Sequence, residues 1–268
     1  MLCKTECISS LCAPEKIWGR TRKQTMKKLM FTAAVAAGLA AFGIESANTV
    51  GYSTTDFTGK TMVCIGTPFT TVGATTFKLG DFTAEGFDAG SDLLQTIDPD
   101  SADGVDFYVY LDAATYGAAL AGWWTDDLSE SKNDEEFDVG TGFLGAFGAQ
   151  EVVLKAAGEV PSAPIEMDFT GKTMVIVPNP LPRTVTLSEI TAEGFDAGSD
   201  LLQTIDPDSA DGVDFYVYLD AATYGAALAG WWTDDLSESA ADVEIPAGEA
   251  MLGAFGAGEV VLTFPAAM

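Results

Sequence analysis

Short apolar runs separated by turn-forming residues dominate most of the chain. KTMVCI at 60–65 and KTMVIV at 172–177 are compact apolar runs that end in proline-containing turns, which is typical of a buried strand. LLQTID at 93–98 and VDFYVYLD at 105–112 flank the turn formers PDSADG, so they predict a β-hairpin. EVVLK at 151–155 and EVVLTF at 259–264 predict closing strands. The pattern predicts an all-β fold.

Alternation in the second hairpin strand assigns a different chemistry to each of its faces. One face carries Val105, Phe107, Val109 and Leu111. The other carries Asp106, Tyr108, Tyr110 and Asp112, a polar and aromatic mixture suited to water or to a partner. The next segment, AATYGAALAGWW at 113–124, predicts a loop, because its alanines favour one helical turn at most and its glycines interrupt a longer helix.

An internal repeat organises the chain. The 49 residues from Thr83 to Ser131 recur without change from Thr191 to Ser239. DFTGKTMV begins at both Asp56 and Asp168, and LGAFGA begins at both Leu144 and Leu252. The first copy carries four extra residues between Val63 and Thr83, and we expect such a difference to lie in a loop.

The repeat predicts two tandem small domains, each a β-sandwich or a partly open barrel, that follow one another along the chain and do not share one merged core. The expected division is an upstream extension at 1–25, a signal peptide at 26–47, a first β repeat domain at 48–160, a linker at 161–167 and a second β repeat domain at 168–268.

The N-terminal segment has the pattern of an export signal. Met26, Lys27 and Lys28 precede the apolar run LMFTAAVAAGLAAFGI, as in a secretory signal peptide. We expect cleavage near Ser46 or Ala47, and no transmembrane helix afterwards, because the run is shorter than the roughly 20 residues that span a bilayer. The predicted location is therefore secreted, periplasmic or at the cell surface.

Charge narrows the class of partner. The chain has 13 basic and 40 acidic residues, and removal of residues 1–47 would leave 6 and 37, a net charge of −31. Such an excess repels nucleic acid and favours cations, basic partners or simple solubility. The predicted partners are further copies of the protein, components of the cell surface or polysaccharide.

The absence of histidine excludes several chemistries. Ser-His and Cys-His catalysis and imidazole-metal sites all need a residue that the chain lacks. Cys3, Cys7 and Cys12 form no Cys-x-x-Cys pair, and Cys64 would be alone after processing, without an intramolecular disulfide. A glycosidase that uses two carboxylates stays possible but has no specific signal. We expect a protein without catalytic residues or an obligatory cofactor.

The hairpin turns concentrate carboxylates. DPDSADGVD supplies Asp98, Asp100, Asp103 and Asp106 in the first copy and Asp206, Asp208, Asp211 and Asp214 in the second. Hard cations such as calcium prefer oxygen ligands of this kind. The string nevertheless has one residue too many for an EF-hand loop and lacks its bidentate Glu, and an ordinary turn uses the same residue types. A calcium site and a plain turn are both open.

Paired tryptophans offer an alternative function. Trp123 and Trp124, and again Trp231 and Trp232, could stack on sugar rings while nearby carboxylates accept hydroxyl hydrogens. Aromatic residues of the core would give the same pattern. Unpaired strand edges offer a third route, assembly by β-augmentation.

The layout resembles that of uncharacterised secreted tandem-repeat β-proteins of environmental Gram-negative bacteria. The features in common are Ala-Asn-x-Val-Gly-Tyr at 47–52, the GKTMV strand, the Asp-rich hairpin and the Gly-Trp pairs at 122–123 and 230–231. The resemblance covers most of residues 47–264 and implies a secreted β-protein, without catalytic residues to carry over. Together these patterns predict a structural or interaction protein of the cell exterior, with calcium binding as one possibility and a carbohydrate-binding module as the alternative.

Overall fold

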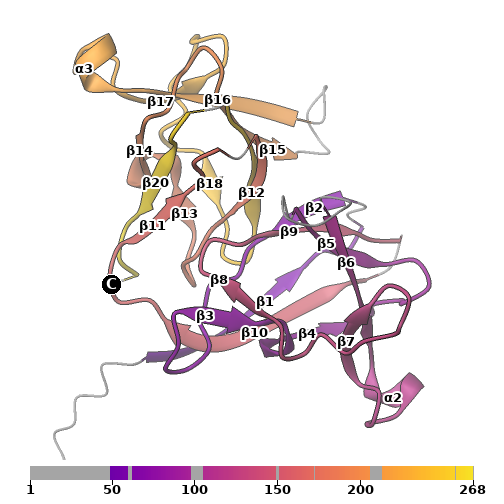
Figure 1. Ribbon diagram of the computed structural model, residues 1–268. Helices are drawn as coiled ribbons and strands as arrows, with labels where there is room; N and C mark the ends of the chain where they lie inside the picture. The colour runs from indigo at the N-terminus through magenta and orange to yellow at the C-terminus, as the bar shows by residue number, and fades with distance from the viewer. Residues whose placement is uncertain are drawn as a thin grey trace, which may run out of the picture. The chain divides into compact units, whose positions relative to one another are not determined.

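Antiparallel strands form nearly all of the regular structure (Figure 1). The computed structural model describes residues 49–59, 62–97, 105–148, 151–171, 173–205, 213–256 and 258–267. Residues 48–268 form one compact unit. The predicted extension and signal peptide lie outside the described residues. We call residues 49–160 the first copy and residues 165–267 the second copy.

The first copy runs through twelve elements. They are β1 (Thr49–Asp56), β2 (Met62–Ile65), β3 (Thr76–Lys78), η1 (Leu79–Asp81), β4 (Phe82–Glu85), β5 (Leu93–Ile97), β6 (Val105–Leu111), α2 (Ala113–Tyr116), β7 (Gly122–Thr125), β8 (Glu136–Asp138), β9 (Phe143–Ala146) and β10 (Val153–Val160).

The second copy repeats the series in the same order. Its elements are β11 (Ile165–Asp168), β12 (Met174–Pro178), β13 (Val185–Thr186), η2 (Leu187–Glu189), β14 (Thr191–Glu193), β15 (Leu201–Ile205), β16 (Val213–Leu219), α3 (Ala221–Tyr224), β17 (Gly230–Thr233), β18 (Glu244–Ile245), β19 (Ala250–Ala254) and β20 (Val261–Phe264).

Each copy builds the same three sheets. The order in the five-stranded sheet is β2-β9-β5-β6-β7 in the first copy and β12-β19-β15-β16-β17 in the second. A three-stranded sheet, β1-β10-β4 or β11-β20-β14, and a two-stranded sheet, β3-β8 or β13-β18, complete each copy. The all-β prediction is therefore confirmed.

Several predicted strands lie where the apolar runs indicated. β5 and β6 pair as an antiparallel hairpin, with Leu94 opposite Tyr108 and Ile97 opposite Val105. The turn between them lies outside the described residues. The longer first copy has a tight turn before β3, where Thr71 N–H bonds Thr76 O at 2.8 Å, and exposed Val72 lies in that turn. β11 begins at Ile165, inside the predicted linker, and the domain boundaries themselves stay a prediction.

The predicted exposed face of β6 is wrong at its centre. Tyr108 is 1% exposed and belongs to the core, and Tyr110 is half-buried against it. The ring of Tyr108 meets Phe137 of β8 edge-on at 6.1 Å, and its hydroxyl donates to Glu135 Oε1 at 2.9 Å. The two-stranded sheet and the loop before it therefore cover a face that strand alternation alone assigns to water.

Segment 113–124 also holds more structure than the predicted loop. The Asp112 carboxylate caps α2 by accepting the N–H groups of Ala114 and Thr115, both at 2.9 Å. The helix ends at Gly117, whose φ of 85° few other residues adopt. α2 is one turn long and leads into β7 (Figure 1). Among the described residues, no helix has the length and apolarity needed to cross a bilayer.

Each copy packs its own core around one tryptophan. Trp123 meets Phe87 edge-on at 5.6 Å in the first copy, and Trp231 meets Phe195 in the same way at 5.4 Å in the second. The two cores draw on separate sets of buried residues, and half-buried Ala267 packs against both. The sequence repeat is thus matched by a repeated packing arrangement.

Two buried aspartates brace the copies in equivalent places. Asp92 accepts the N–H of Asp88 at 2.7 Å with one oxygen and the N–H of Gly148 at 2.6 Å with the other. Asp200 makes the same bonds to Asp196 and Gly256. Each carboxylate therefore fastens the turn before β5 or β15 to the end of β9 or β19.

Candidate functional site

Most of the predicted cation ligands cannot be placed. Asp98, Asp100, Asp103, Asp206, Asp208 and Asp211 lie outside the described residues. Asp106 and Asp214 are described and lie half-buried on β6 and β16. In the described part of the chain, no group of three or more Asp, Glu, Cys or His side chains is arranged to hold a metal ion. A calcium site therefore depends on the hairpin turns themselves and stays a prediction.

An acidic groove lies beside β16 and β17. Its volume is about 490 Å³, and its acidic lining residues are Asp214, Asp234, Asp235 and Glu238. Asp214 on β16 is the only one of the predicted cation ligands among the described residues that line this groove. Its other walls are largely hydroxyl-bearing or apolar, which suits a cationic or hydrogen-bonding ligand.

The turn that forms one wall of this groove holds its carboxylate ionised. Asp235 accepts the hydroxyl of Thr233 at 2.8 Å and the N–H of Ser237 at 3.0 Å. Hydrogen bonds from Ser237, and then from Thr233, lower the pKa of Asp235. Asp127, its equivalent in the first copy, has its pKa lowered to about 2, chiefly by Ser129 and then by Thr125. Both carboxylates carry a full charge at neutral pH.

The basic side chains of the described ranges do not offset the acidic excess. Lys78, Lys132, Lys155 and Arg183 are the basic residues of the described ranges, and each contacts at least one carboxylate. Arg183 makes a two-pronged bond to Glu189 at 2.8 and 3.0 Å. These pairs use only a minority of the carboxylates, so the described part of the chain keeps a large negative excess.

The tryptophan pairs divide into a buried and a half-buried member. Trp123 is 0% exposed and Trp231 is 2% exposed, and their indole N–H groups donate to Phe82 O and Ile190 O. These two indoles cannot stack on a sugar ring, because the core already covers both of their faces. Trp124 and Trp232 are half-buried, so they keep some accessible ring surface.

Exposed apolar side chains surround each half-buried tryptophan in sequence. Tyr116, Leu120 and Leu128 are 40–48% exposed in the first copy, and Tyr224, Leu228 and Leu236 are 42–49% exposed in the second. Trp124 Nε1 donates to Leu120 O at 2.7 Å, which fixes the loop after α2 against β7. We call Tyr116, Leu120, Trp124 and Leu128, with their four equivalents, the apolar loops.

Leu128 and Leu236 have a strained backbone. Both have a φ of 58°, in the left-handed region that a branched apolar residue seldom adopts. Thr125 O accepts the N–H of Leu128 at 2.9 Å, and the tight turn that results holds the leucine side chain toward solvent. Sequence reasoning missed these leucines, because an isolated Leu in an Asp- and Ser-rich turn carries no signal of its own.

The one cysteine of the described residues is unreactive. Burial raises the pKa of the Cys64 thiol to about 12, and Glu249 nearby adds to the effect. The thiolate is therefore scarce at neutral pH, and buried Cys64 is poorly suited to act as a nucleophile.

Comparisons with known proteins identify no relative. No protein-family model matches the chain, and neither a curated protein nor a solved structure is significantly similar to it. The resemblance to secreted tandem-repeat β-proteins therefore stays a prediction.

Proposed function

We propose that this protein is a secreted, strongly acidic, non-catalytic structural or interaction protein of the cell exterior, whose acidic hairpins bind calcium. The apolar loops carry the interaction part of this proposal. Both copies present three exposed apolar side chains, one of them on a strained backbone, from a chain whose net charge is −27. The same side chains recur in both copies, and a strained backbone is retained where a particular side-chain position is needed, so we infer a contact surface at these loops.

Replacement of the exposed leucines tests this interaction. A quadruple variant should no longer self-associate, as measured by light scattering, and should no longer be retained on washed cell envelopes. Its substitutions are Leu120→Asn, Leu128→Asn, Leu228→Asn and Leu236→Asn. Its melting temperature should not fall, because Asn adopts the left-handed backbone of positions 128 and 236 more easily than Leu does.

The matched control is Val72→Asn, which changes an apolar side chain that is 60% exposed but lies outside the apolar loops. This control should associate like the unsubstituted protein. Equal association and retention in all three proteins would contradict an interaction through the apolar loops.

The repeated acidic hairpins support the calcium part of the proposal. Four carboxylates fall within nine residues in each copy, and the last of them in the second copy, Asp214, also lines the groove beside β16. Oxygen ligands at this density suit a hard cation. The groove also leaves room for water molecules, which complete the coordination of many calcium sites.

Thermal unfolding of residues 48–268 tests cation binding. Calcium should raise the melting temperature by several degrees relative to magnesium and to chelator, because selective binding to the native state stabilises it. Asp100→Ala with Asp208→Ala should abolish the rise. Glu151→Ala with Glu259→Ala, which removes two exposed carboxylates at equivalent positions elsewhere, should preserve it. Identical curves with and without calcium would leave the hairpins as ordinary turns.

A carbohydrate-binding module is the second candidate function. The half-buried rings of Trp124 and Trp232 favour it, with exposed Tyr116 and Tyr224 on the preceding helices. An acidic polysaccharide is unsuitable for so negative a chain, so a neutral one is the appropriate probe. It should quench tryptophan fluorescence in the unsubstituted protein and not in Trp124→Phe with Trp232→Phe. Quenching that persists in this variant, in which only Trp123 and Trp231 remain of the four, would refute the role.

A further inference from the structure

The two copies contact each other through equivalent residues in exchanged roles. Gly140 of the first copy lies against Met167 of the second, since a Cβ added to Gly140 would be 2.9 Å from Met167 Cγ. The repeat aligns Gly140 with Gly248 and Met167 with Thr55. Gly248 of the second copy lies against Thr55 of the first. The second contact is thus the first one with the copies exchanged.

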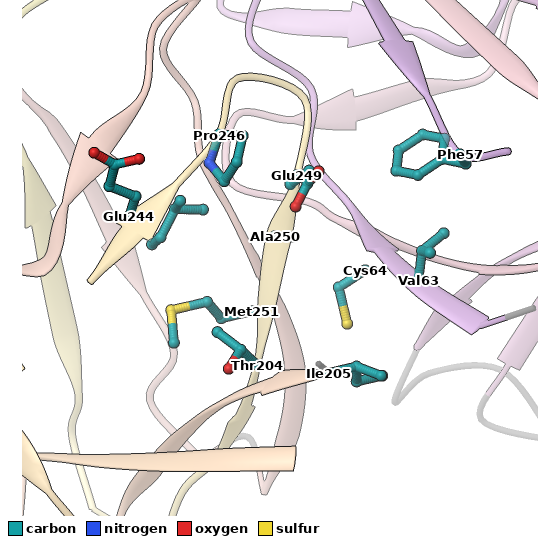
Figure 2. Close-up of a pocket in the computed structure, with 11 residues that line it drawn as sticks. Phe57, Val63, Cys64, Thr204, Ile205, Glu244, Pro246, Glu249, Ala250 and Met251 are labelled. Carbon is teal, nitrogen blue, oxygen red and sulfur yellow. The ribbon is translucent and has the colours of Figure 1, made fainter. Parts of the chain in front are cut away.

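A second pair of contacts obeys the same rule. Gly142 of the first copy lies against Ile176 of the second, whose Cβ would be 2.9 Å from a Cβ at residue 142. The equivalent residues are Ala250 and Cys64, and both line one cavity of about 50 Å³ between β2, β15 and β19 (Figure 2). Figure 2 shows Cys64 between the β19 residues and Ile205.

Contacts between strands repeat this exchange on a larger scale. β12 of the second copy contacts β5 of the first, and β2 of the first copy contacts β15 of the second. β2 also contacts β12, its own equivalent. A surface in which residue i meets residue j while j meets i is isologous, the geometry of a two-fold dimer.

The exchange of contacts between the two copies is incomplete where their sequences differ. Gly66 N–H donates to Gly248 O at 2.9 Å, and Ile65 pairs with Glu249 in an isolated antiparallel bridge. The residue equivalent to Gly66 is Pro178, which has no N–H to donate in return. Gly66 also permits the close approach, because an added Cβ would be 2.5 Å from Glu249 O.

We propose that each copy carries a self-complementary pairing face, and that the partner of this face is a second copy of the repeat, so that the chain is a fused dimer. The pairing face comprises Thr55, Cys64, Gly66, Gly140 and Gly142 in the first copy and Met167, Ile176, Pro178, Gly248 and Ala250 in the second. This inference is independent of the calcium and apolar-loop proposals, because it uses none of their residues.

Side-chain size on the pairing face sets which copies pair best. The large Ile176 faces Gly142, which has no side chain, and the smaller Cys64 faces Ala250. Two first copies would bring Cys64 against Gly142, which leaves a gap but no clash. Two second copies would bring Ile176 against Ala250, whose methyl group would occupy the space that Ile176 fills. The mixed pair is therefore best, a pair of first copies is allowed, and a pair of second copies is excluded.

Cleavage between the copies tests the proposal on folded protein. Residues 161–164 lie between β10 and β11, so a specific protease site in place of Ser162 and Ala163 permits cutting after residues 48–268 have folded. Native mass spectrometry then resolves every pair, because the two fragments differ in mass. The mixed pair should predominate, pairs of the first fragment should form slowly as fragments exchange, and pairs of the second fragment should be absent.

Other distributions would overturn the proposal. Fragments that separate as monomers would show that the linker alone holds the copies together. A mixed pair that never yields pairs of the first fragment would show a face that is not self-complementary. Abundant pairs of the second fragment would contradict the size argument.

A variant on the pairing face supplies a second readout. Gly142→Leu should separate the cleaved fragments. Gly258→Leu, at an exposed position where the nearest atom to an added Cβ is Gly194 O at 4.0 Å in the same copy, should leave them paired. Emission of the buried Trp123 and Trp231 reports whether both cores stay folded in each variant. Paired fragments in folded Gly142→Leu protein would refute the contact.

Discussion

At the scale of single residues, the buried aspartates Asp92 and Asp200 need both of their carboxylate oxygens. Both oxygens of Asp92 accept backbone N–H groups, and Asp200 does the same in the second copy. An asparagine would turn its NH₂ group toward one of these donors. Asp92→Asn should therefore lower the free energy of unfolding by about 1–3 kcal/mol, measured by urea denaturation. Asp126→Asn, at an exposed position, is the control and should have no effect.

The burial and role of single residues could be predicted from the sequence only in part. Trp123 and Trp231 were predicted to be either core or sugar-binding residues, and their burial agrees with the core interpretation. Asp92 and Asp200 gave no signal, because FDAGSD reads as an exposed turn until the end of β9 or β19 packs against it. Burial of a carboxylate depends on distant backbone groups, here those of Gly148 and Gly256.

At the scale of elements, the short helices depend on one charged cap each. Hydrogen bonds from Thr115 lower the pKa of Asp112, and those from Thr223 lower the pKa of Asp220. A carboxylate with a lowered pKa in the folded state stabilises that state above its unfolded pKa of about 3.9, and this contribution disappears as the pH falls through the folded pKa.

The two caps therefore predict a pH-dependent effect. Asp112→Asn with Asp220→Asn should melt below the unsubstituted protein at pH 7, and the two melting temperatures should converge as the pH falls below about 4. Protonation also reduces the overall charge repulsion, but it does so in both proteins. The difference between their melting temperatures at each pH therefore reports the effect of the caps. A difference that persists unchanged to pH 2 would contradict the role of the ionised caps.

Strands with a clear apolar run or a hairpin pattern could be predicted from the sequence, whereas β1 could not. β2 and β12 lie in the expected apolar runs and are buried along most of their length, and β5 and β6 form the predicted hairpin. β1 has the sequence TVGYSTTD and half-exposed alternation, and only its pairing with β10 along eight residues makes it a strand. Register with a distant partner is invisible in a local pattern.

At the scale of the whole molecule, charge is the dominant property. The chain has a net charge of −27, and the described cations are already paired, so the carboxylates repel one another in the folded state. Sodium chloride should raise the melting temperature of residues 48–268 by several degrees as ionic strength rises from about 0.01 to 0.15 M, over which the screening length falls from about 30 to 8 Å. Salt-independent melting would mean that the surplus charges lie too far apart to interact.

The sequence by itself determined the all-β class, the repeat, the acidic character and the absence of histidine chemistry, because each follows from composition or from local spacing. Only the tertiary structure decided which face of β6 is buried, that Trp123 and Trp231 are inaccessible, and that Cys64 and Ile176 each lie close to residues of the other copy. These outcomes depend on which distant strands pack against one another. That packing depends on many residues from distant segments being buried together, so it cannot be inferred from any one segment.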